Sequence, residues 1–124
     1  MKLSNRIFIS EFPEAVRNLK VLVLPVGVSY KIITFLKELE ANAAIYDEAR
    51  MLLVNKYGEK NDDGELNKNE DGTVPLVDAE GFQKEFNELL EIEQKYKFKK
   101  IKLPEDVEIS VNDLMLLEDI LEIG

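Results

Sequence analysis

The residues best placed for chemistry lie in a polar segment, residues 58–77, which carries two Asp-Gly pairs. An EF-hand calcium loop places oxygen ligands at positions 1, 3, 5 and 12, with glycine at position 6. In this chain, positions 1, 3, 5 and 12 are Asn67, Asn69, Asp71 and Asp78, and position 6 is Gly72. The usual Asp and Glu are missing at the first and last positions, which weakens calcium binding. A turn-rich polar connector explains the same residues, so we predict no metal or cofactor and keep calcium as the alternative.

Histidine and cysteine are both absent from the chain. Their absence excludes Ser-His and Cys-His nucleophiles, zinc-thiolate sites and disulfides. The 25 acidic residues form many pairs, such as Glu38 with Glu40 and Glu118 with Asp119. These acidic residues lie mostly outside the apolar stripes of the predicted helices, as expected for helix faces in contact with solvent. The sequence therefore predicts no catalytic residues and a protein that is not an enzyme.

Lysines interleave with aromatic and apolar residues over residues 95–102, where Tyr96 and Phe98 alternate with Lys95, Lys97 and Lys99. Surfaces that bind single-stranded nucleic acid combine basic and aromatic side chains in this way. An edge strand with buried rings, whose lysines block edge-to-edge pairing, explains the pattern as well. The net charge of −9, from 25 acidic and 16 basic residues, opposes binding to a phosphate backbone. Nucleic acid is therefore not an expected partner.

The strongest helical pattern runs from about Val26 to Tyr57. Its apolar stripe recurs every three or four residues, with Arg50 as the one break. The stripe comprises Ile32, Leu36, Leu39, Ala43, Tyr46, Leu53 and Tyr57. About thirty residues make a helix of roughly 45 Å. Asp78 is the predicted N-cap of a second helix, about 79–93, which a returning segment over 58–77 would place antiparallel to the first. The segment 58–77 itself is predicted to be a polar loop or a β-hairpin excursion.

The two ends of the chain add shorter elements. Residues 3–9 predict a strand or extended arm, and a helix follows from Ser10 to about Leu19. An edge strand is expected to end at Pro104, before a last helix that reaches about Glu122. Together these patterns predict a single domain, 1–124, with a mainly helical α+β fold. It comprises a long helix with an antiparallel partner helix, a C-terminal helix and a few short edge strands.

Three segments carry a resemblance to known proteins. They are YDEARMLLVNKYGEK at 46–60, GFQKEFNELLEIE at 81–93, and KIKLPED with ISVNDLMLLEDILE at 100–122. Together they resemble small uncharacterised proteins encoded by phages and prophages of Gram-positive bacteria, over about residues 25–122. The resemblance brings no catalytic motif, and it implies a virus-derived protein that acts inside the infected cell or in a particle.

The apolar length of the long helix exceeds what residues 79–93 can cover, which predicts a protein partner or a homo-oligomer. The interface candidates are Ile32, Leu36, Leu39, Tyr46, Leu53, Leu117, Ile120 and Leu121. We expect a non-enzymatic phage protein for interaction or assembly that self-associates. The alternative is an acidic inhibitor that mimics nucleic acid and blocks a host defence or nucleic-acid-processing enzyme. No apolar run approaches ~20 residues and no signal peptide is recognised, so we expect no membrane partner and a location in the host cytoplasm or a virus particle.

Overall fold

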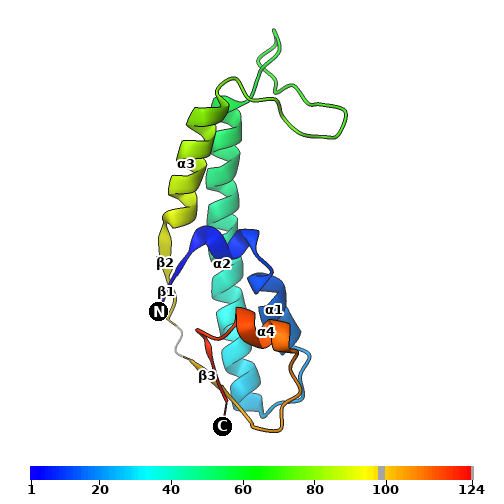
Figure 1. The fold of residues 1–124 in the computed structure, drawn as a ribbon, viewed down its shortest axis with the longest axis vertical. Coiled ribbons are helices and arrows are strands. Elements are labelled where there is room, and N and C mark those ends of the chain that lie inside the picture. The colour runs from blue at the N-terminus through cyan, green and yellow to red at the C-terminus, as the bar shows by residue number, and fades with distance from the viewer. Residues whose placement is uncertain (98–99, 124) are drawn as a thin grey trace. The chain divides into compact units, whose positions relative to one another are not determined.

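The computed structural model describes residues 1–97 and 100–123, and its fold is α+β and mainly helical, as predicted (Figure 1). The elements follow in the order β1 (Lys2–Ser4), the 3-10 helix η1 (Asn5–Ile9), α1 (Phe12–Leu19), α2 (Val26–Tyr57), α3 (Ala79–Glu91), β2 (Glu93–Lys95), β3 (Ile101–Leu103), α4 (Val111–Leu116) and β4 (Leu121–Ile123). The chain forms two compact units. The first unit is Met1–Ala43 with Glu93–Gly124, and the second unit is Ala44–Ile92.

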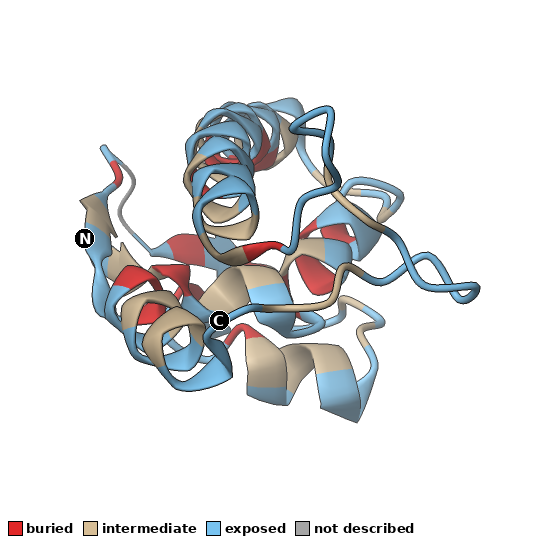
Figure 2. Ribbon diagram, turned by 90° about the horizontal axis from the view of Figure 1, so that it is seen from above, coloured by how far each residue is buried: buried red, intermediate tan, exposed pale blue. Residues whose placement is uncertain are grey.

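The core of the first unit is built around Phe35, whose side chain is fully buried. The ring of Phe12 meets it edge-on at a centroid distance of 6.4 Å, and the ring of Tyr96 lies 5.5 Å away. The surrounding buried residues come from α1, α2, β3 and the C-terminal segment. The core therefore joins residues from both ends of the sequence, and its helices bury one side each (Figure 2).

Two small sheets belong to the first unit. β1 pairs antiparallel with β2, with Lys2 opposite Lys95, and β3 pairs parallel with β4, with Ile101 opposite Leu121. In β3 the two outer residues are buried while Lys102 between them is exposed, which is the alternation of a half-buried strand. A parallel pair needs a crossover, and α4 lies within it.

Several boundaries differ from those predicted. Only residues 2–4 of the first segment form a strand, and 5–9 form a 3-10 helix. The single edge strand expected before Pro104 is two strands in different sheets, β2 and β3. The last helix ends at Leu116 instead of about Glu122, because Leu121–Ile123 pair with β3. Pairing with a distant strand overrides the local helical pattern there.

The second unit contains the helical hairpin that the sequence predicts. α3 runs antiparallel beside the part of α2 that lies in this unit (Figure 1). Tyr57 on α2 meets Phe82 on α3 edge-on at 6.2 Å, and Phe82 stacks on Phe86 at 5.8 Å. Asp78 caps α3 as predicted, since its Oδ1 accepts a hydrogen bond from the Gly81 N–H at 3.0 Å. The connection over 58–77 holds two isolated antiparallel bridges, Gly58 with Leu76 and Lys60 with Leu66.

Candidate functional site

The polar side chains of the predicted calcium register are used in local turns. The Asp71 carboxylate accepts hydrogen bonds from the Thr73 N–H at 3.0 Å and from the Thr73 hydroxyl at 2.6 Å. These bonds lower the pKa of Asp71. The Asn69 amide donates to the same hydroxyl at 2.9 Å. Gly72, with φ of +86°, adopts the left-handed conformation that the turn requires.

The other two members of that register point to different partners. The Asn67 amide donates to the Glu59 carboxylate at 2.9 Å, and Asp78 is engaged as the cap of α3. Within residues 1–97 and 100–123, no group of three or more acidic side chains is placed to hold a metal ion. The oxygen-bearing side chains of this loop therefore stabilise turns and a helix end.

The interface candidates are, with one exception, covered by the chain itself. Seven have buried side chains: Ile32, Leu36, Leu39, Tyr46, Leu117, Ile120 and Leu121. Leu53 is half-buried. The candidates on the long helix lie on the side that packs inward, and the other three belong to the C-terminal segment, so the seven buried residues do not offer a surface to a partner in this conformation.

Three of the exposed large apolar side chains of the second unit lie together on α2. Ile45, Met51 and Leu52 are 60%, 44% and 66% exposed, and Ala44 beside them is exposed too. A spacing of seven residues, two helical turns, places Ile45 and Leu52 on the same side of the helix. We call Ala44, Ile45, Met51 and Leu52 the α2 outer face.

Sequence reasoning missed this face because it followed a single stripe. The signal that identifies it is the distribution of apolar residues around the whole circumference of the helix. A helix that is apolar all round is normally covered all round. In the sequence, Ile45 and Leu52 alternate with residues of the main stripe without belonging to it. In the structure both side chains are in contact with solvent.

Charge is distributed unevenly between the two units. The second unit carries 13 acidic and 5 basic residues, whereas the first unit carries 12 and 11. The second unit therefore accounts for −8 of the net charge of −9. Two of its ion pairs are Lys56–Glu85, with 2.9 Å between Nζ and Oε2, and Arg50–Asp47, with 3.8 Å between Nε and Oδ1. The Tyr57 hydroxyl and Lys56 lower the pKa of Glu85.

The lysine-aromatic segment does not present its described ring for base stacking. Tyr96 is buried against Phe35, and burial raises the pKa of its hydroxyl. Lys97 is exposed, and its backbone N–H donates to the Glu38 carboxylate at 2.9 Å. Phe98 and Lys99, which belong to the same predicted pattern, lie outside the described residues.

Among the described residues, no helix combines the length and the apolar character needed to cross a membrane. The chain matches no family model, no curated protein and no solved structure.

Proposed function

We propose that this protein is a non-enzymatic binding protein that self-associates through the α2 outer face. The observation that carries the proposal is the exposure of Ile45, Met51 and Leu52 on one helix of the second unit. Fully burying a side chain of this size contributes about 1.5–3 kcal/mol. A partner that covers this face therefore gains several kcal/mol from three residues.

A second copy of the chain is the partner that we favour. In an isologous pair the same patch contributes from both copies, so each favourable contact occurs twice. If two copies of this helix pair antiparallel, with the two-fold axis near Glu48, Ile45 of one copy faces Leu52 of the other. The two Glu48 carboxylates then lie near the axis, and their repulsion opposes the apolar contacts. The small Ala44 side chain lets the two backbones approach closely.

The resemblance of three segments to small phage proteins supports a phage context for this role, in assembly or interaction inside the infected cell or in a particle. The same resemblance brings no catalytic motif, which supports a binding role over catalysis.

Analytical ultracentrifugation over a range of protein concentrations tests self-association. We expect the wild-type chain to dimerise and Leu52→Glu to weaken the dimer by at least about 100-fold, since two buried leucines are replaced. The matched control is Val111→Glu, which adds the same charge at an exposed valine of the first unit and leaves dimerisation unchanged. A wild-type monomer at the highest concentration, or equal effects of the two variants, would refute the proposal.

The alternative function, an acidic inhibitor that mimics nucleic acid, is supported by the concentration of negative charge in the second unit. A mimic presents carboxylates where a nucleic acid presents phosphates, so its binding weakens with salt. The test is affinity capture from a Gram-positive host lysate, followed by mass spectrometry. This function predicts capture of nucleic-acid-binding proteins that added DNA displaces. A variant with Asp62→Asn, Asp63→Asn and Glu65→Gln should lose them.

A further inference from the structure

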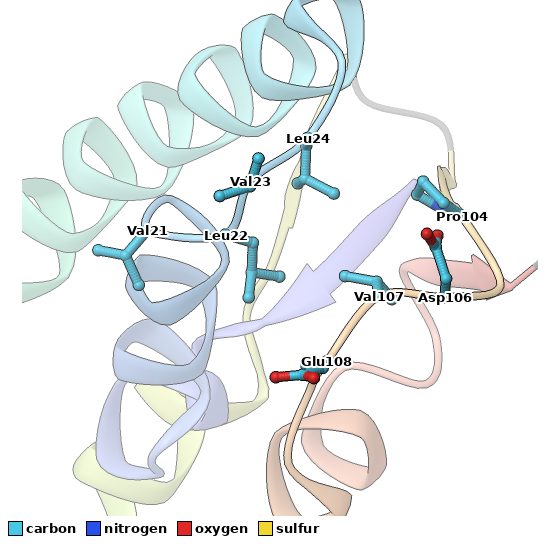
Figure 3. A pocket seen from close by; sticks show the side chains of 8 residues that line it. All are labelled: Val21, Leu22, Val23, Leu24, Pro104, Asp106, Val107 and Glu108. Carbon is cyan, nitrogen blue, oxygen red and sulfur yellow. The ribbon is translucent and has the colours of Figure 1, made fainter.

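A pocket of about 370 Å³ lies in the first unit between two connecting segments, residues 21–24 and 104–108 (Figure 3). Leu22 and Leu24 are half-buried against the core, whereas Val21 and Val23 are 81% and 101% exposed. Val21 and Leu22 form the turn that follows α1, because their amides donate to the Asn18 and Leu19 carbonyls, and only Val23 and Leu24 lie beyond that turn. The volume is within the range of pockets that bind ligands.

The backbone of both walls is available for pairing. On one wall, the amides of Val23 and Leu24 form no hydrogen bond with any described residue, and on the other wall the same holds for Glu108. Neither segment belongs to one of the described sheets. Unpaired backbone amides of this kind can accept an added extended segment through main-chain hydrogen bonds.

The charge of the lining is entirely acidic. Asp106 and Glu108 line the pocket, and no lysine or arginine is among its eight lining residues. The remaining lining side chains are apolar, with Val107 directed towards the wall that holds Leu22 (Figure 3). An occupant that matches this surface carries apolar side chains and positive charge, whereas an anionic lipid surface is repelled by the two carboxylates.

We infer that this pocket, which we call the 21–108 groove, binds an extended segment of a partner protein in which lysine or arginine alternates with apolar residues. Apolar side chains of the segment contact Leu22, Leu24 and Val107. Its cations lie beside Asp106 and Glu108, and its backbone pairs with the free amides of the walls. This surface belongs to the first unit and is separate from the α2 outer face, so either proposal can fail without the other.

The test uses the full chain and a fluorescent acetylated peptide of alternating lysine and valine, eight residues long. Fluorescence anisotropy at low salt should give binding in the micromolar range, and 15N-labelled protein should show NMR shifts at Val23 and Glu108. The same peptide with alternate backbone amides methylated should bind at least 10-fold more weakly. An alternating glutamate-valine peptide should not bind, and neither should vesicles containing phosphatidylglycerol.

Two double variants separate the groove from general attraction to an acidic protein. Asp106→Asn with Glu108→Gln should weaken peptide binding at least 10-fold. Asp62→Asn with Asp63→Asn removes the same charge from the second unit and should change binding less than 2-fold.

Three results would overturn the inference. These are no binding of the lysine-valine peptide at 1 mM, equal weakening by the two double variants, and undiminished binding of the methylated peptide. Binding of the lipid vesicles in place of the peptide would assign the groove to a membrane surface and would overturn it as well.

Discussion

Replacing Tyr96 by phenylalanine should stabilise the protein, because the Tyr96 hydroxyl is buried without a hydrogen-bond partner among the described residues. The ring packs against Phe35 at 5.5 Å, and the substitution leaves that contact in place. The neighbouring Asn42 side chain opposes the rise in the pKa of Tyr96 that burial causes, but it does not reach hydrogen-bond geometry. The variant therefore removes a buried polar atom without removing a hydrogen bond.

The magnitude follows from two opposing effects. Burying a hydroxyl without a partner costs about 1–3 kcal/mol in protein mutational data. Removing one oxygen leaves a void of about 15 Å³, which costs about 0.4 kcal/mol at 24 cal/mol per Å³. We expect a net gain of about 1 kcal/mol, or a rise of about 3–6 °C in Tm for a chain of this length.

The gain should grow in alkali. An unfolded tyrosine loses its proton near pH 10, whereas burial raises the pKa of Tyr96 in the fold. Above pH 10 the folded state therefore binds more protons than the unfolded state, and the stability of the wild type falls as pH rises through the folded pKa. Phenylalanine does not titrate. Burial also raises the pKa of Tyr46, but that residue is present in both proteins and its effect cancels.

Urea unfolding followed by circular dichroism at pH 7 and at pH 10.5 measures both effects. The matched control is Tyr30→Phe, since Tyr30 is exposed and its hydroxyl is hydrated in the folded and unfolded states. A Tyr96→Phe variant that is less stable than the wild type at pH 7 by 1 kcal/mol or more would refute the reasoning, because it would mean that the hydroxyl makes a stabilising bond.

Two further predictions concern the second unit and the long helix. Gly58→Ala should destabilise the second unit by about 1–3 kcal/mol, because a Cβ there lies 2.6 Å from the Val54 carbonyl oxygen and 2.6 Å from Leu66 Cδ2. The control Gly27→Ala, a helical position with open space around it, should instead raise stability by up to about 1 kcal/mol in the same urea assay. Glu85→Gln should lower Tm at pH 7 but not at pH 3, since the lowered pKa of Glu85 gives stability that is present above its unfolded pKa and lost as pH falls through the folded pKa. Glu88→Gln, an exposed residue of the same helix, is the control, and an equal loss in both variants would contradict a specific role for the Lys56–Glu85 pair.

The helices were the most predictable part of the fold, because each carries its own local signals. Apolar residues at helical spacing predicted α2 from Val26 to Tyr57 with the bounds that the structure has. Asp78 predicted the start of α3 through its capping side chain. Such signals lie within a few residues of the element that they specify, so a single sequence reveals them.

Features that depend on distant contacts were not predictable in the same way. The end of α4 at Leu116 depends on the pairing of Leu121 with Ile101, which no pattern within 110–122 records. The interface prediction chose the most regular apolar stripe, and regularity favoured the buried side of α2. The 21–108 groove joins segments about 80 residues apart in the sequence. Neither of its walls carries a motif by itself.

The order of the sequence has a consequence for synthesis of the first unit. Its core contains Phe12 and Phe35 from early in the chain, together with Ile101, Leu117 and Ile120 from late in the chain. The ribosome synthesises the early core residues well before the late ones. We therefore expect the early apolar side chains to remain exposed until residue 121 has left the exit tunnel. The second unit is one continuous stretch, 44–92, and can close its hairpin while the rest is still being made. During that interval the early core side chains, Phe12 and Phe35 among them, are exposed to solvent and to chaperones.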